Sequence, residues 1–498
     1  MSTPVDDVAV IHAQVERFRA ARGELEHVVR SVAQSLDGRR FTWQASVHGD
    51  RAPVGGYVML ELEGRAAFGQ VLSAELAEVA VADVGDGQTL RSNVAIRLLR
   101  GAGALLDGPA APFHDAPVRP ATADEVQAWR RRADADGAAL PIGELVDAPG
   151  VTAALDAKGF GRHTFLCGQS GSGKTYALGV ILDRLLAGTR LRVVVLDPNS
   201  DFVGLGDVRD GVHEEQAARH RAVAPGIVVR RAGGAASARL HVPFGGLGDD
   251  ERAALLRLDP IADREEYAAL VELLREHRPE TLTELPEAGT ESARRLAQRA
   301  ANLGIEDLGI WSRGDTGSVL DDLGRADVRC LVVDLGSLPT RTEQALVAEA
   351  VLAGLWRQRQ EREPVLIVID EAHNVCPAEP RDELGRLAAE HVVRIAAEGR
   401  KFGLHLLLCT QRPQKVPENA LSQCDNLVLM RLNSRADAAF AQEAFSFVPA
   451  GLLALAPDFA LGQALIAGPI ARAPLVVRFG GRVSREGGGD VAHDWAAR

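Results

Sequence analysis

The sequence predicts an α/β protein in which a small β-rich domain precedes a larger domain of alternating strands and helices. Three patterns predict this class. Short apolar runs alternate with helix-forming runs from about residue 140 to 480, the stretch 41–108 is β-rich and interrupted by glycines, and strand patterns are missing between 246 and 325. With 498 residues, of which 46% are hydrophobic, the chain is long enough for two or three domains that each bury a core.

The N-terminal part is expected to hold a helix and then a barrel. Apolar residues recur at helical spacing over 8–36, so we assign residues 1–38 to a long amphipathic helix. The β-rich segments that follow predict a small β-barrel domain over 39–118. A Pro/Ala-rich stretch and a resumed helical pattern then predict a linker with a helix over 119–140.

The larger α/β domain is assigned to residues 141–480. A helical subdomain is expected to be inserted at about 246–325, and the glycine-rich end, 481–498, is expected to be a flexible tail. Buried strands are expected at 164–167, 191–196, 330–335, 365–369 and 405–410, and helices at 174–186, 342–360 and 382–398.

Composition excludes several classes of protein. The longest apolar runs, such as 365–369 and 404–409, are far shorter than the roughly 20 residues that span a bilayer, and no basic-then-apolar leader opens the chain. We therefore expect a cytoplasmic protein without a membrane anchor. The five cysteines lie singly in apolar stretches without CxxC spacing, which is typical of buried thiols in a reducing compartment. The net charge of −12 disfavours a basic surface that coats nucleic acid, but it permits DNA inside a narrow channel with a basic lining.

A phosphate-binding loop stands between an apolar strand and a helical run. Residues 168–175 read GQSGSGKT and match G-x-x-x-x-G-K-S/T in full. Glycines let successive backbone N–H groups face a triphosphate, the Lys174 ammonium reaches the β- and γ-phosphates, and the Thr175 hydroxyl ligates Mg²⁺. The sequence thus predicts ATP and Mg²⁺ as cofactors. The residues expected at the nucleotide are Gly168, Ser170, Gly171, Ser172, Gly173, Lys174, Thr175 and Tyr176.

Two acids follow the apolar run 365–369. Asp370 is expected to hold Mg²⁺, and Glu371 to polarise the attacking water. His373 completes the letters DEAH, but helicases of superfamily two carry two ATPase lobes. Only 87 residues follow Gln411, too few for a second lobe of roughly 150 residues. His373 is therefore expected to pack or to form a hydrogen bond.

Further polar residues suit roles in hydrolysis. Gln411, at the tip of the run 405–410, is the candidate γ-phosphate sensor, because a polar group there can report hydrolysis. Arg400 and Lys401 follow a predicted helix, and Arg162 precedes the strand before the phosphate-binding loop. Each is either a cation that stabilises transition-state charge or a residue that merely compensates a helix dipole. Whether they would act on their own or a neighbouring subunit's nucleotide is left open.

These pieces, in their order, resemble the HerA family of DNA-translocating ATPases within the HerA–FtsK group. The resemblance covers roughly 140–480 and rests on the following segments: IGEL (142–145), RHTFLCGQSGSGKT (162–175), LDPNSDF (196–202), LVVDLGSL (331–338), VIDEAHNVCP (368–377), EGRKFG (398–403), TQRP (410–413) and LSQCDNLVLMRL (421–432). Asp197 matches a family aspartate followed by proline. The family's usual Glu-Tyr ending is replaced here by Asp201-Phe202, which leaves the role of that position open.

The resemblance implies a RecA-like P-loop ATPase core behind a small β-barrel domain. It also implies a homo-hexameric ring with ATP sites between neighbours, double-stranded DNA threaded through the centre, and a partner on one face. That partner would be a nuclease (NurA-like) or another effector, including those of antiviral defence. No nuclease-like cluster of acids occurs outside the ATPase motifs, so a separate chain would supply any cleavage.

Two function classes follow from this resemblance. The first is an ATP-driven DNA translocase or helicase. The second is a regulatory or scaffolding ring whose ATP binding sets the activity of an effector, which the acidic charge and the 22 aromatic residues favour slightly. A conjugation or packaging ATPase of the same superfamily is a third option, disfavoured because the membrane-anchored members carry transmembrane helices.

Overall fold

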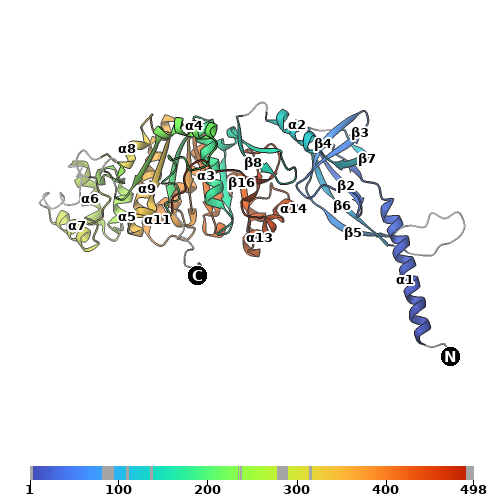
Figure 1. The fold of residues 1–498 in the computed structure, drawn as a ribbon. Coiled ribbons are helices and arrows are strands. Elements are labelled where there is room, and N and C mark those ends of the chain that lie inside the picture. Colours follow the sequence, from blue (N-terminus) through green and yellow to red (C-terminus); the bar gives the residue numbers. More distant parts are fainter. Residues whose placement is uncertain are drawn as a thin grey trace, which may run out of the picture.

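The computed structural model describes residues 4–80, 95–107, 111–134, 138–233, 235, 238–276, 290–312 and 317–488. Figure 1 shows an elongated molecule, with a β-barrel and helix α1 (Pro4–His27) at one end, an α/β domain in the middle and a group of short helices at the other end.

The barrel is built from antiparallel strands. The sheet order β2-β1-β7-β3-β4-β6 closes through pairing of β2 with β6, and β5 lies outside on β6. Along β2, Phe41, Trp43 and Ala45 are buried while the residues between them are exposed, as the period of two requires. This confirms the predicted barrel. Its strands are β1 (Val32–Ser35), β2 (Arg40–Ser46), β3 (Tyr57–Leu62), β4 (Arg65–Val71), β5 (Glu75–Ala80), β6 (Ala95–Leu105) and β7 (Phe113–Pro120).

The predicted boundaries around the barrel need correction. Helix α1 ends at His27, so the helix expected over 1–38 is wrong beyond that residue, and the chain continues into β1. Pairing with β2 and β7 explains the difference, because it takes Val32–Ser35 into the barrel as a strand. A tight turn follows, in which Asp37 accepts hydrogen bonds from the backbone N–H groups of Arg39 and Arg40 and Gly38 has φ +66°. At the other end β7 runs to Pro120, two residues past the expected limit of 118. Helix α2 (Ala123–Ala133) follows as predicted, with a capping box made by Thr122 and Glu125.

The α/β domain is organised around one eleven-stranded sheet. Its order is β12-β13-β11-β14-β15-β10-β16-β17-β18-β8-β9, parallel from β12 to β16 and antiparallel beyond β16. The strands are β8 (Ala139–Leu145), β9 (Thr152–Asp156), β10 (His163–Cys167), β11 (Arg192–Asp197), β12 (Ile227–Arg231), β13 (Cys330–Asp334), β14 (Val365–Ile369), β15 (Leu404–Thr410), β16 (Cys424–Met430), β17 (Gln463–Ala467) and β18 (Leu475–Phe479).

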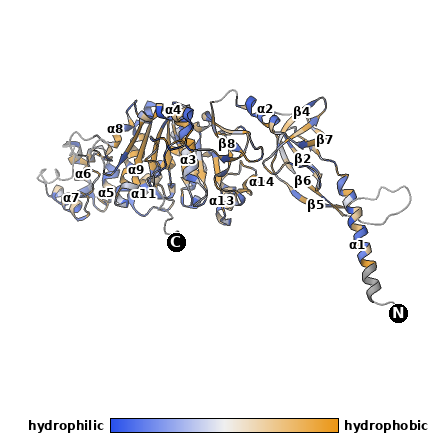
Figure 2. Ribbon diagram, in the orientation of Figure 1, coloured by the Kyte–Doolittle hydropathy of each residue, from blue (hydrophilic) through white to orange (hydrophobic). Residues whose placement is uncertain are grey.

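Helices cover both faces of this sheet, which explains its continuous apolar strands (Figure 2). Val193 and Val195 belong to the core on the α3 side, and Val194 and Leu196 to the core on the α9 and α11 side. The helices of this domain outside the insertion are α3 (Lys174–Gly188), α4 (Glu214–Val223), α9 (Arg341–Arg357), α10 (Ala372–Val375), α11 (Glu383–Glu398), α12 (Glu418–Leu421), α13 (Arg435–Ala444) and α14 (Ala450–Leu453).

The predicted helical insertion lies between β12 and β13. It contains α5 (Asp249–Leu255), α6 (Arg264–Glu276), α7 (Glu291–Asn302) and α8 (Val319–Leu323). Its apolar side chains join the core cluster that also contains α9 and α11 residues, so the insertion extends that core.

The predicted flexible tail is wrong for residues 481–488, which pack against the sheet domain. Arg482 and Ser484 are 1% and 0% exposed. The N–H groups of Val483 and Ser484 donate to Asp183 Oδ2 on α3 at 2.6 and 3.1 Å, and the N–H of Arg482 donates to the Tyr176 hydroxyl at 2.9 Å. These contacts tie the segment to α3, because the buried Asp183 carboxylate needs donors. The rest of the expected tail lies outside the described residues.

All five cysteines are buried as free thiols, as predicted. Among the described residues, no helix combines the length and the apolar character that crossing a membrane requires.

Candidate active site

The phosphate-binding loop connects β10 to α3 at the carboxyl edge of the parallel strands. Gly171 and Gly173 have φ of +72° and +94°, which only glycine adopts without strain, and a Cβ on Gly168 would lie 2.8 Å from Ser172 Oγ. Helix α3 has no side-chain cap, so the amides of its first turn face the loop. Ser170 and Gly171 are exposed at the loop's outer side. The conformation of the loop therefore depends on its glycines, and the loop leads into an uncapped helix N-terminus.

Side chains of the loop point inward. Lys174 is 7% exposed, and its Nζ lies 3.4 Å from the Gln169 carbonyl oxygen. Ser172 is 1% exposed, and its Oγ has no hydrogen-bond partner among the described residues. A buried hydroxyl and a nearly buried ammonium that lack strong protein partners fit an anionic ligand with several oxygens.

Two carboxylates stand opposite the loop, where β14 ends. Asp370 is 2% and Glu371 9% exposed, and Glu371 Oε1 lies 4.0 Å from Lys174 Nζ. Glu371 has φ +41°, a left-handed conformation that is rare outside glycine and asparagine and costs on the order of 1 kcal/mol. The structure thus brings together Lys174, Asp370 and Glu371. These are the residues that the sequence analysis expects to bind the phosphates, to hold Mg²⁺ and to polarise the attacking water.

Two further carboxylates join Asp370 in a candidate cation site. Asp197, Asp201 and Asp370 offer oxygens that lie within 4.8 Å of one another, and the Thr175 hydroxyl bonds to Asp201. Within the part of the chain that the structure describes, Asp370 Oδ2 is buried without a hydrogen-bond partner. Burial, with neighbouring carboxylates, raises the pKa of Asp370 to about 7. Hard oxygen donors, one of them unpartnered, fit Mg²⁺.

Asp201 was given no role from the sequence alone. Asp197 accepts hydrogen bonds from the amides of Asn199, Asp201 and Phe202, and this turn folds residue 201 back beside Thr175. The Asp-Pro dipeptide at the end of an apolar strand was the available signal for the turn, but the spacing did not reveal which side chain returns to the loop.

Strand β15 lies between β14 and β10, so its end reaches both the carboxylates and the phosphate-binding loop. The backbone N–H of Gln411 donates to the Glu371 carboxylate. His373 Nδ1 lies 2.9 Å from Thr410 Oγ1 and 3.2 Å from Glu371 Oε2. Burial alone would raise the pKa of Glu371, but His373, Lys174 and the Gln411 amide together hold it below its usual value. Glu371 is therefore kept ionised, and the expectation that His373 forms a hydrogen bond agrees with the structure.

The structure does not bring Arg162, Arg400 and Lys401 to the phosphate-binding loop of their own chain. They precede β10 and β15, at the amino edge of the strands, about 16 Å from the loop for a five-residue strand at 3.3 Å per residue. Arg162 and Arg400 share Asp425, at 3.2 and 3.4 Å, and both are more than 40% exposed. An action on the chain's own nucleotide is therefore wrong for these residues. The two roles left from the sequence analysis are an action on a neighbouring subunit's nucleotide and compensation of a helix dipole.

The fold and this site define a P-loop ATPase. Residues 140–304 match the family model described as the central domain of helicase HerA, and residues 259–415 match the FtsK/SpoIIIE family. Residues 140–304 are thus similar to the HerA central domain, and residues 259–415 are similar to FtsK/SpoIIIE proteins.

Individual relatives and solved structures are similar to different shares of the chain. A probable helicase of Methanocaldococcus jannaschii is 25% identical over 71% of this chain and 69% of its own length. The DNA double-strand break repair helicase HerA of Sulfurisphaera tokodaii is 29% identical over 32% of this chain and 33% of its own length, so the chain matches about a third of that relative. Among solved structures, VirB4 of Thermoanaerobacter pseudethanolicus aligns with 69% of this chain and 96% of its own, at 15% identity and a TM-score of 0.48.

Proposed function

We propose that this protein is an ATP-driven motor that moves double-stranded DNA, and that it hydrolyses ATP between the subunits of a homo-hexameric ring. The observation that supports the ATPase chemistry most directly is the meeting of Lys174, Asp370 and Glu371 at one edge of the sheet, beside a phosphate-binding loop whose Ser172 hydroxyl lacks a partner. The HerA-like central domain supports the DNA-translocating class.

Each residue has a distinct task in hydrolysis. The amides of residues 168–175 and the Lys174 ammonium bind the phosphates, and Glu371 accepts a hydrogen bond from the attacking water and directs it at the γ-phosphate. Asp370, Thr175 and Asp201 would hold Mg²⁺, which supplies charge neutralisation of the phosphate oxygens when bound. Gln411, next to Glu371, would respond to the presence of the γ-phosphate, and Tyr176 would line the nucleotide's outer side.

The arginines support a site shared between subunits. Arg162, Arg400 and Lys401 lie at the edge opposite the phosphate-binding loop, so a head-to-tail ring would bring this edge of one subunit to the loop of the next. A guanidinium there would stabilise charge that develops on the γ-phosphate.

The second candidate function is a regulatory ring, in which bound ATP sets the assembly and activity of an associated effector. The net charge of −12 favours it, because DNA transport requires a basic path through an otherwise acidic protein. In either case we propose a partner, a NurA-like nuclease or a defence-associated effector, that docks on one face of the ring in the cytoplasm.

Electron microscopy of the purified protein, with and without ATP, tests the ring and its channel in one observation. ATPase assays with and without duplex DNA then separate the two functions. The motor requires DNA-stimulated hydrolysis that disappears in Glu371→Gln. Effector activation by a nonhydrolysable ATP analogue in the absence of DNA would favour the regulatory ring.

A further inference from the structure

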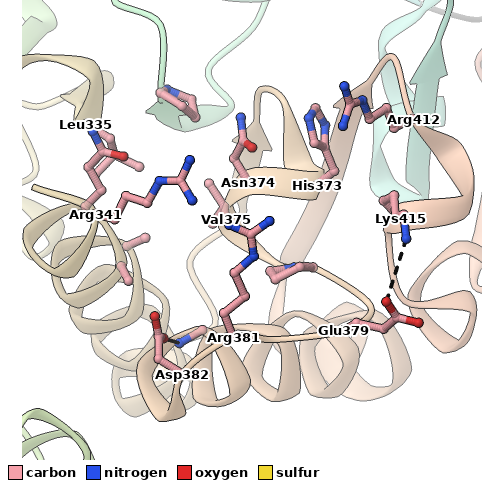
Figure 3. A pocket seen from close by; sticks show the side chains of 16 residues that line it. Leu335, Arg341, His373, Asn374, Val375, Glu379, Arg381, Asp382, Arg412 and Lys415 are labelled. Carbon is pink, nitrogen blue, oxygen red and sulfur yellow. Dashed lines mark hydrogen bonds and ion pairs between the residues drawn. The ribbon is translucent and has the colours of Figure 1, made fainter.

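A cavity of about 490 Å³ opens beside the carboxylates, on the α9 and α11 side of the sheet (Figure 3). Its walls come from the residues that follow four neighbouring strands, β13, β11, β14 and β15, and from the first turns of α9 and α11. In open α/β sheets, ligands bind outside the carboxyl ends of the strands. The function proposed above leaves this cavity without a role.

The lining carries more positive charge than its neighbours neutralise. Within the described ranges, Arg341, Arg381 and Arg412 have no carboxylate within ion-pair distance. The other charged lining residues are engaged: Lys415 pairs with Glu379 at 3.7 Å, and Asp382 accepts from the Gly385 amide at 2.8 Å. Figure 3 shows the Arg341 and Arg381 guanidinium groups turned into the cavity, whereas Lys415 turns toward Glu379.

The positions of two of these arginines are unfavourable without a ligand. Arg341 is the first residue of α9, and Arg381 directly precedes Asp382, the N-cap of α11. A cation near the positive end of a helix dipole is unfavourable. An anion between the two helix ends would reverse the sign of both interactions, and guanidinium groups bind phosphate through paired hydrogen bonds.

The lining also indicates which part of a phosphate ligand is held. None of the sixteen residues around the cavity is Phe, Tyr or Trp, and the one aromatic ring among them, that of His373, is held by Thr410 and Glu371. Contacts would therefore reach phosphate groups and not bases, which suits a nucleic-acid backbone bound irrespective of sequence.

One lining residue connects this cavity to the ATPase site. His373 faces the cavity and, through Nδ1, contacts both Thr410 and Glu371. A change in the position of His373 would therefore alter the support of the carboxylate that orients the attacking water.

We propose that the cavity binds phosphate groups of the DNA backbone and that His373 is a positioning residue that links this binding to Glu371. The proposal rests on the DNA-motor function and names its phosphate contacts and their route to the ATPase site.

The first test compares duplex binding by wild-type protein and by the double variant Arg341→Gln/Arg381→Gln, using a fluorescent DNA duplex and a nonhydrolysable ATP analogue. We expect at least a roughly tenfold loss of affinity, and a log–log salt slope that is shallower by about two. Basal ATP hydrolysis should be unchanged, and stimulation by DNA should be lost. Arg386→Gln is the matched control, because Arg386 lies on α11, pairs with Glu383 and Glu390, and does not line the cavity.

The second test isolates His373. His373→Ala should bind the duplex as wild type does but lose stimulation of hydrolysis, and His373→Gln, which keeps a hydrogen-bonding group near Glu371, should restore part of it. A residue with a purely structural role would lower basal and stimulated rates by the same factor in both variants.

Three results would overturn the proposal. Wild-type affinity and salt slope in the double variant would remove the cavity from DNA binding. Binding of inorganic phosphate alone that depends on Arg341 and Arg381, without binding of the duplex at the cavity, would assign the cavity to a small anion. Competition of inorganic phosphate with the duplex only at millimolar concentration would instead support the DNA backbone as the ligand. If wild-type protein binds no duplex while hydrolysing ATP, the DNA-motor function fails as well, which distinguishes that outcome from the first.

Discussion

The two edges of the parallel strands differ in how their polar and charged side chains are paired. At the carboxyl edge, a buried serine hydroxyl and an aspartate oxygen lack hydrogen-bond partners among the described residues. Glu371 has a left-handed backbone conformation there, and the arginines that face the cavity form no ion pair with a described carboxylate. At the amino edge, Arg162 and Arg400 share Asp425. The carboxyl edge is thus prepared for ligands, whereas the arginines of the amino edge are paired but exposed and available to another molecule.

Among substitutions at the two edges, Lys174→Ala should reduce nucleotide binding or turnover the most. It removes the cation that faces both the phosphates and Glu371, so nucleotide binding or turnover should fall below detection. Calorimetric titration with Mg·ATP and a phosphate-release assay measure both. Undiminished ATPase activity would refute the assignment of the carboxyl edge as the active site.

Arg400→Ala tests whether the amino edge serves a neighbour. Turnover should drop by about a thousandfold while nucleotide affinity is largely kept, because transition-state charge loses its guanidinium. In rings mixed from wild-type and variant subunits, activity should depart from proportionality to the wild-type fraction. Strictly proportional activity would place the function of Arg400 within its own subunit.

Glu371→Gln keeps the shape of the carboxyl edge but removes its proton acceptor. We expect ATP to bind normally and hydrolysis to slow by roughly a hundredfold or more. Single-turnover kinetics with preformed enzyme·ATP measure the chemical step alone. An equal loss of affinity would mean that Glu371 acts in binding.

A buried histidine at the amino edge should make the stability of the protein depend on pH. His163 is fully buried at the start of β10, its Nδ1 accepts the Leu406 amide at 2.9 Å, and burial lowers its pKa to about 4. The unfolded chain therefore binds a proton that the native state excludes, so stability should fall as the pH drops from about 6.5 toward 4, by on the order of 2–3 kcal/mol.

Denaturant unfolding of the wild type and of His163→Asn across this pH range tests the prediction. Asparagine keeps an acceptor but does not titrate, so the acid-side slope should be smaller. His114→Asn is the control, because His114 is 88% exposed. An unchanged slope in His163→Asn would exclude His163 as its source.

Asp425→Asn should have the smallest effect. An exposed ion pair contributes about 0.2–1 kcal/mol, so loosening Arg162 and Arg400 should lower ATP turnover by no more than about fivefold. Steady-state ATPase assays beside the exposed-residue control Glu418→Gln measure it. A larger loss would mean that Asp425 itself takes part in the site.

The elements that were predicted well are those whose structure follows from their own local sequence. Buried parallel strands such as β14 are unbroken apolar runs, and the phosphate-binding loop is fixed by its glycines. Strand β1 was missed because its four residues are too few to show a clear alternation. Strand β7 was cut short because its run contains proline and arginine, and its residues take their places only when the barrel closes.

The site was predictable only where a residue adjoins its motif. Lys174 ends the loop that follows β10, and Glu371 lies two residues after β14, so chain order places both at the carboxyl edge. Asp201 reaches the site through a turn, and the amino-edge position of Arg400 depends on the direction of β15 in the sheet. Such placements follow from tertiary packing, which cannot be predicted from the spacing of residues along the chain.

The packing of residues 481–488 bears on how shortened or tagged versions of the protein should be designed. Deleting the glycine-rich end from Gly480 onward would leave the Asp183 carboxylate, on the helix that begins at Lys174, without either of its amide donors. It would also free the Tyr176 hydroxyl from the Arg482 amide. An affinity tag joined after Gly488 keeps all three bonds, so the safe truncation point lies well beyond the last strand of the sheet.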